Sequence, residues 1–220
     1  MLSGRETEPS ETLIASVERF GTPLDVLDGP VAPALLRRIN SDDVVAGVLG
    51  ARRAPGGARP VGHIVAEILQ KAGKPVLVVP PEHAHASLRP WRRVLVPLEG
   101  TEASATAASH ALANLTGAAD AVVLHVFTPD TAPVVLDRAG RDLMIWDDEF
   151  LARFGPPGAR LEHRSGVAAH EIVKACDRDH ADMVVLSWSQ SMTSGHAAVV
   201  RDVLAWSAIP VLLTPARGAG

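Results

Sequence analysis

The fold of this chain is decided by the run Arg92-Arg-Val-Leu-Val-Pro-Leu-Glu-Gly-Thr-Glu-Ala-Ser-Ala-Thr-Ala-Ala-Ser-His-Ala-Leu112. It predicts a buried strand at 94–96, because apolar residues on both faces are typical of a parallel strand covered by helices on both sides. Pro97 cannot donate a ladder hydrogen bond and ends the strand. Thr101 is a suitable N-cap for the alanine-rich helix that follows.

Apolar runs and amphipathic runs alternate in the rest of this C-terminal part. The expected strands are 121–126, 160–164, 182–186 and 209–213. The expected helices are 142–154, 166–179 and 197–206. Strands that alternate with helices predict a parallel sheet with right-handed crossovers, and therefore an α/β fold.

The N-terminal part predicts the back half of a second copy. The expected helices are 11–20, 31–39 and 64–72, and the expected strands are 24–27, 43–49 and 75–79. The element order of 31–80 recurs in 167–215, at an offset of about 135 residues. A repeat of this length indicates duplicated domains rather than a solenoid. The prolines between residues 80 and 90 mark a linker.

Composition excludes several classes of protein. Of 220 residues, 47% are hydrophobic and 21% are charged, which predicts a packed globular chain. The net charge is −4 and no basic run stands out, which argues against nucleic acid as a partner. No apolar run is long enough for a membrane helix, and residues 1–10 lack a signal-peptide core. The single cysteine, Cys176, excludes an intrachain disulfide and agrees with a cytoplasmic location.

Several of these segments, in order, resemble the universal stress protein family. The run 93–104 is similar to the opening strand, turn and helix of its domains, 163–188 to its third strand, third helix and fourth strand, and 210–213 to its closing strand. The resemblance implies an α/β fold with a five-stranded parallel sheet of order 3-2-1-4-5 and helices on both faces, preceded by a partial copy. The expected divisions are 11–80 for the partial domain, 81–91 for a linker and 92–216 for the complete domain.

The partial copy is expected to lack the first strand, first helix and second strand of the family. It is expected to keep the equivalents of strands three, four and five. Family dimers pair through the fifth strand, so the two closing strands, near 76–79 and 211–213, are expected to face each other in an intrachain pseudo-dimer. A homodimer is an alternative, as is a longer gene product in which further residues precede Met1.

The resemblance also implies where a nucleotide would bind. Nucleotide-binding members carry a Gly-x2-Gly-x9-Gly-Ser/Thr loop, in which glycines let the backbone approach phosphates. In the first copy Gly50 and Gly62 remain, but Arg53 stands at the second glycine and His63 at the hydroxyl residue. In the second copy the aligned residues contain no glycine at the three motif positions.

The resemblance places the expected nucleotide-binding residues of the second copy in three segments. These are the end of the strand at 94–96, where Glu99 replaces the family's Asp, the end of the strand at 121–126, which lies near the adenine in the family, and the loop after the strand at 182–186. The residues are Pro97, Glu99, Thr101, Val126, Ser187, Ser189, Gln190, Gly195 and His196.

Each candidate has a simpler interpretation. Glu99 either binds a ribose or base amine or is a solvated turn carboxylate. The 187–194 hydroxyls either bind an anion or form a polar loop. Three arginines of 52–59, with His63, either form an anion site or are surface charge. The histidines show no metal-ligand spacing, and Cys176 lies on the apolar side of its helix.

We therefore predict a non-enzymatic cytoplasmic stress-response protein that acts as a binding and regulatory module. No residues are placed as a nucleophile with a base. No cofactor or metal is expected, and the partners are a second copy of the fold and a protein of unknown identity. The alternative is an ATP- or AMP-binding regulator with slow hydrolysis or phosphotransfer.

Overall fold

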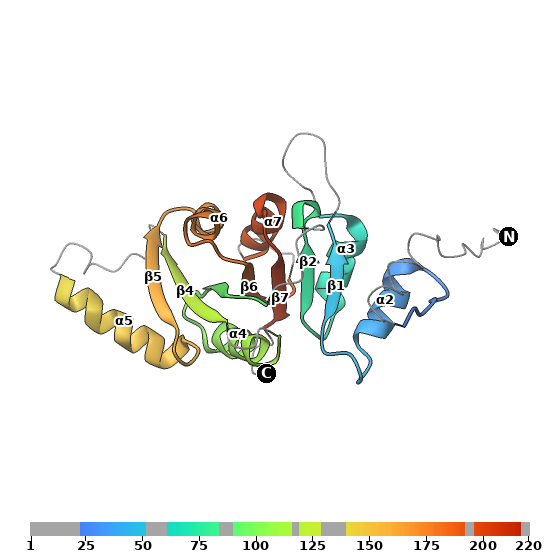
Figure 1. Ribbon diagram of the computed structural model, residues 1–220, viewed down its shortest axis with the longest axis horizontal. Coiled ribbons are helices and arrows are strands. Elements are labelled where there is room, and N and C mark those ends of the chain that lie inside the picture. Colours follow the sequence, from blue (N-terminus) through green and yellow to red (C-terminus); the bar gives the residue numbers. More distant parts are fainter. Residues whose placement is uncertain are drawn as a thin grey trace.

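The chain forms one sheet with helices on both faces (Figure 1). The computed structural model describes residues 23–51, 61–83, 90–115, 119–128, 140–191 and 196–216. The helix expected at 11–20 lies outside these ranges.

The elements alternate as the sequence predicts. The strands are β1 (Gly47–Gly50), β2 (Val76–Val79), β3 (Arg93–Pro97), β4 (Asp120–Phe127), β5 (Arg160–Ser165), β6 (Met183–Trp188) and β7 (Val211–Pro215). The helices are α2 (Val31–Ile39), α3 (His63–Lys71), α4 (Glu102–Leu115), α5 (Gly140–Phe154), α6 (Ala168–Arg178) and α7 (His196–Trp206), with a short 3-10 helix η1 (Pro81–His83). The strand expected at 43–49 begins only at Gly47, and no strand forms at 24–27.

The sheet has seven strands in the order β1-β2-β7-β6-β3-β4-β5. Strands β3 to β7 are mutually parallel and follow the order 3-2-1-4-5. The expectation of a five-stranded parallel sheet as a separate unit is wrong, because β2 pairs antiparallel with β7. This pairing joins the two copies into one mixed sheet.

The pairing of β2 with β7 is self-complementary. Val76 lies opposite Leu213, Leu77 opposite Leu212, and Val78 opposite Val211. At the repeat offset of about 135, Val76 corresponds to Val211 and Val78 to Leu213. Val76 therefore faces the residue that corresponds to Val78, and Val78 faces the residue that corresponds to Val76, as in an isologous two-fold contact. The contact expected between the closing strands is present, within a single chain.

The expectation of a strand at 24–27 is wrong, for a physical reason. Residues 23–28 are exposed and have no regular secondary structure. A strand needs a neighbour to accept and donate its ladder hydrogen bonds. Among the described residues β1 is the edge of the sheet, so the first copy contributes two strands rather than three.

Two apolar clusters cover the two faces of the sheet. Helices α2, α3, α6 and α7 bury residues against one face, which we call the upper face because α6 and α7 lie above the sheet in Figure 1. Helices α4 and α5 pack on the opposite, lower face. Val94 and Val96 face α4 and α5 while Leu95 faces the other cluster, as the alternation of a strand requires. None of the described helices has the length and apolarity to cross a membrane.

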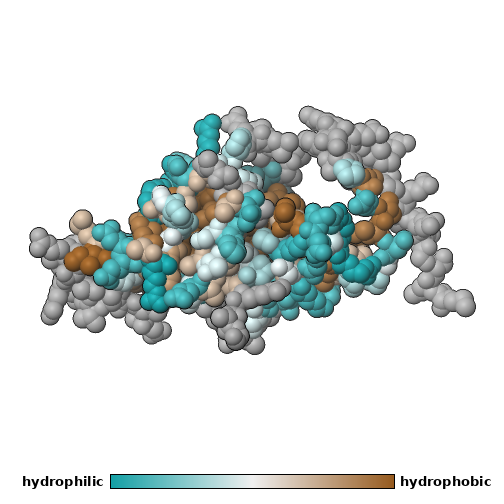
Figure 2. All heavy atoms as spheres, turned by 90° about the horizontal axis from the view of Figure 1, so that it is seen from below, coloured by the Kyte–Doolittle hydropathy of each residue, from teal (hydrophilic) through white to brown (hydrophobic). Residues whose placement is uncertain are grey.

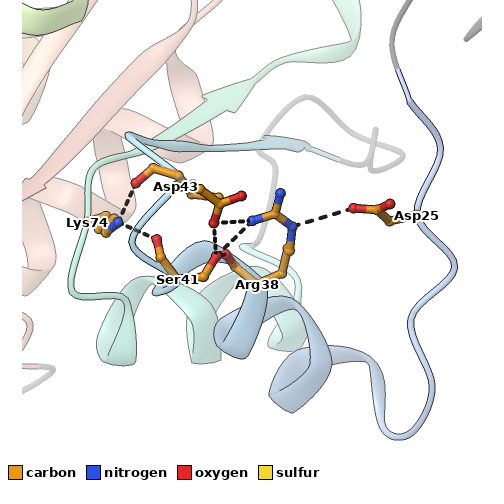
Figure 3. A network of polar contacts seen from close by, with 6 residues as sticks. Asp25, Arg38, Ser41, Asp43 and Lys74 are labelled. Atoms are coloured by element: carbon orange, nitrogen blue, oxygen red, sulfur yellow. Dashed lines mark hydrogen bonds and ion pairs between the residues drawn. The ribbon is translucent and has the colours of Figure 1, made fainter.

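Polar contacts order the turn between α2 and β1 (Figure 3). Lys74 donates hydrogen bonds to the backbone carbonyls of Ser41 and Val44. Arg38 donates to Asp43 at 2.9 Å, and Ser41 donates to the same carboxylate at 2.8 Å. The bonds from Ser41 and then Arg38 lower the pKa of Asp43. The turn that precedes β2 is thereby tied to the turn that precedes β1.

Candidate functional site

The first candidate site lies where the strand order reverses. β3 is flanked by β4 on one side and β6 on the other, so the carboxyl ends of β3 and β6 form a topological switch point. Ligands of open α/β sheets bind in this crevice. Glu99 follows β3 and Ser187 lies near the end of β6, so the sheet brings these two predicted residues to one edge.

A hydroxyl cluster surrounds Glu99. The Glu99 carboxylate accepts hydrogen bonds from Thr101 at 3.0 Å and from Ser104 at 3.1 Å. The Ser104 backbone N–H lies 3.3 Å from the Thr101 hydroxyl, which confirms Thr101 as the N-cap of α4. Gly100 has φ +89°, and this left-handed conformation turns the chain from β3 into the helix. The cluster holds Glu99 over the first turn of α4.

Ser187 is bonded within the fold. Its hydroxyl donates to the backbone carbonyl of Ser104 at 2.8 Å. This bond links the end of β6 to the first turn of α4 across the switch point. The hydroxyl that could have faced an anion is therefore directed at a carbonyl.

Gln190 makes a long-range contact that the sequence does not predict. Its Nε2 donates to the backbone carbonyls of Leu69 at 2.9 Å and Ala72 at 2.7 Å. These are carbonyls at the C-terminus of α3, where a helix leaves acceptors without internal partners. Gln190 has φ +59°, a left-handed conformation that favours glycine. The second-copy loop is thus fastened to the first copy.

Two other predicted residues of the second copy, Pro97 and Val126, lie at the carboxyl ends of the neighbouring strands β3 and β4. Pro97 lies within the ladder of β3, opposite Leu124. Val126 lies next to the last residue of β4, near the strand end as expected, where it is half-buried and packs against the cluster formed with α6 and α7. Ser189 is exposed, His196 begins α7, and Gly195 lies outside the described residues.

The first-copy loop borders a different kind of site. Gly50, Gly62 and His63 line a cavity of about 250 Å³ beside the N-terminus of α3. Most of its other lining residues are apolar. Arg53 and the neighbouring arginines lie outside the described residues, so the anion site expected there is untested.

Sequence reasoning missed a buried imidazole, His125. Its side chain is 8% exposed, and its Nδ1 lies 2.8 Å from the backbone carbonyl oxygen of Leu98. The rings of Phe127, Trp146 and Phe150 surround it at centroid distances of 4.7, 5.3 and 4.9 Å. A signal was present, because His125 falls on the same face of its strand as Phe127.

We predict that His125 makes stability depend on pH. Burial lowers the pKa of His125 from its usual value of 6.5, although the bond to Leu98 opposes this. The unfolded chain therefore takes up a proton first as the pH falls, and stability is lost below about pH 6.5. Thermal unfolding between pH 8 and pH 5.5 should show a decline that His125→Gln flattens.

The matched control for this measurement is His110→Gln. His110 is an exposed histidine on α4 and should leave the slope unchanged. His163, whose Nδ1 lies 3.7 Å from Asp147, is present in all three proteins. Its charge also lowers the pKa of His125, so the double variant His125→Gln/His163→Gln separates the two histidines. An equal slope for His125→Gln and the wild type would contradict the prediction.

Cys176 is not a reactive thiol. It is 4% exposed, and burial raises the pKa of its thiol to about 12. Thiols react as thiolates, so the neutral form makes this side chain part of the core, as its place on the apolar side of the helix predicts. Among the described residues no group of three or more metal-ligating side chains converges.

Comparisons with known proteins were made for the whole chain. The model of the universal stress protein family matches residues 90–215. A search of curated proteins found no match. A universal stress protein from Archaeoglobus fulgidus DSM 4304 aligns with a TM-score of 0.69 and 16% identity, over 94% of this chain and 78% of its own.

Other solved structures are similar to the chain as well. A putative universal stress protein from Pseudomonas aeruginosa UCBPP-PA14 aligns with a TM-score of 0.67 and 16% identity, over 96% of this chain and 80% of its own. A universal stress protein solved in complex with cAMP aligns with a TM-score of 0.44 and 20% identity, over 59% of this chain and 100% of its own. The structures from Archaeoglobus fulgidus and Pseudomonas aeruginosa show the same fold over nearly the whole chain.

Proposed function

The chain belongs to the universal stress protein family, and we propose that it acts there as a non-enzymatic binding and regulatory module with degenerate nucleotide-binding loops, the second of which has taken on a structural role. The observation that carries this proposal is the pair of hydrogen bonds from Gln190 to the C-terminus of α3. A loop that cradles phosphates must offer free backbone N–H groups and close approach. In this loop the side chain of Gln190 instead donates hydrogen bonds to backbone carbonyls of the same chain.

The neighbouring polar groups support the same conclusion. The Ser187 hydroxyl is directed at the Ser104 carbonyl, and the Thr101 and Ser104 hydroxyls are directed at Glu99. Binding a phosphate here would require these bonds to break. Each internal bond that is lost without replacement costs about 0.5 to 1.5 kcal/mol.

Exposed apolar side chains favour a protein partner. Most of the large hydrophobic residues that are exposed in the described part of the chain belong to the first copy. They are Leu24, Val26, Leu27, Val31, Val45 and Val48, between 40% and 73% exposed. Figure 2, which views the molecule from below, shows brown surface at the end that carries the first copy. Apolar surface of this kind marks interaction sites.

The alternative function is an ATP- or AMP-binding regulator with slow hydrolysis or phosphotransfer. The observation that favours it is the position of Glu99, at the switch point and above the first turn of α4. A carboxylate there could accept hydrogen bonds from a ribose.

A nucleotide titration tests the proposal. We expect no rise in melting temperature with ATP or AMP at millimolar concentration, with or without magnesium. A ligand that binds only the folded chain would stabilise it by about 2.7 kcal/mol at a hundredfold excess over its dissociation constant. A dose-dependent rise that Glu99→Ala abolishes, and that the exposed control Glu149→Ala keeps, would establish the alternative.

A second arm of the experiment tests the structural role of the loop. Gln190→Ala should lower stability by about 1 to 2 kcal/mol, because two carbonyls of α3 lose their donor. Ser189→Ala, at the exposed neighbouring position, should change it by less than about 0.5 kcal/mol. Equal effects of the two substitutions would remove the observation on which the proposal rests.

A further inference from the structure

The cavity beside α3 is an apolar chamber within the upper layer of the molecule. Its volume is about 250 Å³. Side chains from β1, α3, β2 and α7 line it, among them Leu49, Val65, Val78 and Leu204. Ala51, the residue after β1, also lines it. Cavities of about 150 Å³ with aliphatic walls stay dry and accept benzene, so this chamber is large enough for a small apolar ring.

The internal repeat identifies the residue that corresponds to Ala51. Gly50 of β1 lies opposite Val79, and Ser187 of β6 lies opposite Thr214. Val79 and Thr214 are about 135 residues apart, which is the offset of the repeat. Gly50 therefore corresponds to Ser187, and the residue after each also corresponds. These residues are Ala51, which follows β1, and Trp188, which ends β6.

Trp188 and Ala51 stand at equivalent positions of the two copies, but Trp188 has a large side chain and Ala51 a small one. Trp188 is 4% exposed and belongs to the buried cluster on the upper face. Ala51 is on the same face, packed against the same cluster. Val78, in the wall of the cavity, corresponds to Leu213, a member of the cluster that contains Trp188. The two copies thus place an indole ring and an open chamber at related positions.

We propose that this chamber binds an uncharged, planar aromatic molecule of about the size of indole. The pseudo-symmetric position shows that this fold accommodates an indole ring between the sheet and its upper helices. Seven of the ten residues that line the cavity have apolar side chains, which favours an uncharged ring, because removing an ion from water without a partner is costly. The imidazole of His63 and the backbone of Gly50 and Gly62 border the same cavity. This binding does not depend on the structural role proposed for the second-copy loop, which rests on the hydrogen bonds of Gln190.

Indole itself is the probe for this site. Titration of the full chain with indole should raise the melting temperature in a dose-dependent way and give saturation-transfer NMR signals for the bound ring. Ala51→Trp should fill the chamber, raise the melting temperature without ligand, and weaken indole binding at least tenfold. Ala152→Trp, at an exposed position on α5, is the matched control and should bind indole as the wild type does.

Two results would overturn the proposal. The first is the absence of any shift or NMR signal up to the solubility limit of indole. The second is unchanged indole binding in a folded variant whose chamber is filled. Ala51→Leu provides the smaller filling variant, so the test remains decisive if Ala51→Trp does not fold.

Discussion

Trp188→Ala is expected to lower the free energy of unfolding by about 3 to 5 kcal/mol, the largest effect of a single substitution that we anticipate. Trp188 ends β6, is 4% exposed and packs in the cluster that α6 and α7 form with the sheet. Removing the indole loses its transfer free energy and leaves a cavity that the strand and helices cannot close. Urea denaturation followed by circular dichroism measures the loss.

A second tryptophan provides the control for this experiment. Trp206, the last residue of α7, is 52% exposed. Trp206→Ala removes the same atoms from a side chain that is only about half-buried, so its cost should be clearly smaller, about 1 to 2 kcal/mol. Similar losses for the two variants would show that the buried cluster does not depend on Trp188.

Leu213→Ala is expected to destabilise both copies together, by about 2 to 5 kcal/mol. Leu213 is 1% exposed and lies opposite Val76 in the antiparallel pairing that joins the copies. Because hydrogen bonds and apolar contacts cross this junction, unfolding of one side exposes the other. Calorimetry should therefore show one transition for the wild type and one, at lower temperature, for the variant.

Hydrogen exchange locates the effect. Amides of β1 and β2 should lose protection along with those of β6 and β7, although Leu213 belongs only to the second copy. Leu27→Ala, at a residue that is 40% exposed in the first copy, should change stability by less than about 1 kcal/mol. Two separate transitions, with only one shifted by Leu213→Ala, would contradict a single cooperative unit.

Local chemistry was sufficient to predict most of the elements. The β3 strand, the Thr101 cap and α4 follow from residues adjacent in sequence, because Pro97 ends the ladder and a hydroxyl at an N-cap satisfies the first backbone donors. The contact of the closing strands was predicted in another way, from the resemblance to a family whose dimers pair through the fifth strand.

The candidate site was predicted less well, because its contacts are long-range. Gln190 bonds to carbonyls at residues 69 and 72, which become its neighbours only when β2 and β7 pair. His125 lies within a strand whose pattern predicts burial, but its aromatic surroundings come from α5. Periodicity identifies a face of an element and does not identify what packs on it.

The sequence by itself determined the α/β class, the order of most elements and the resemblance to the family, because these depend on local periodicity and on motifs in a fixed order. Only the tertiary structure decided that the two copies share one mixed sheet, that residues 24–27 form no strand, and that the second loop is bonded to the first copy. A strand exists only where a neighbour completes its ladder, and a polar side chain takes whichever partner the fold brings within hydrogen-bond distance. Both conditions are set by residues that are far apart in the chain.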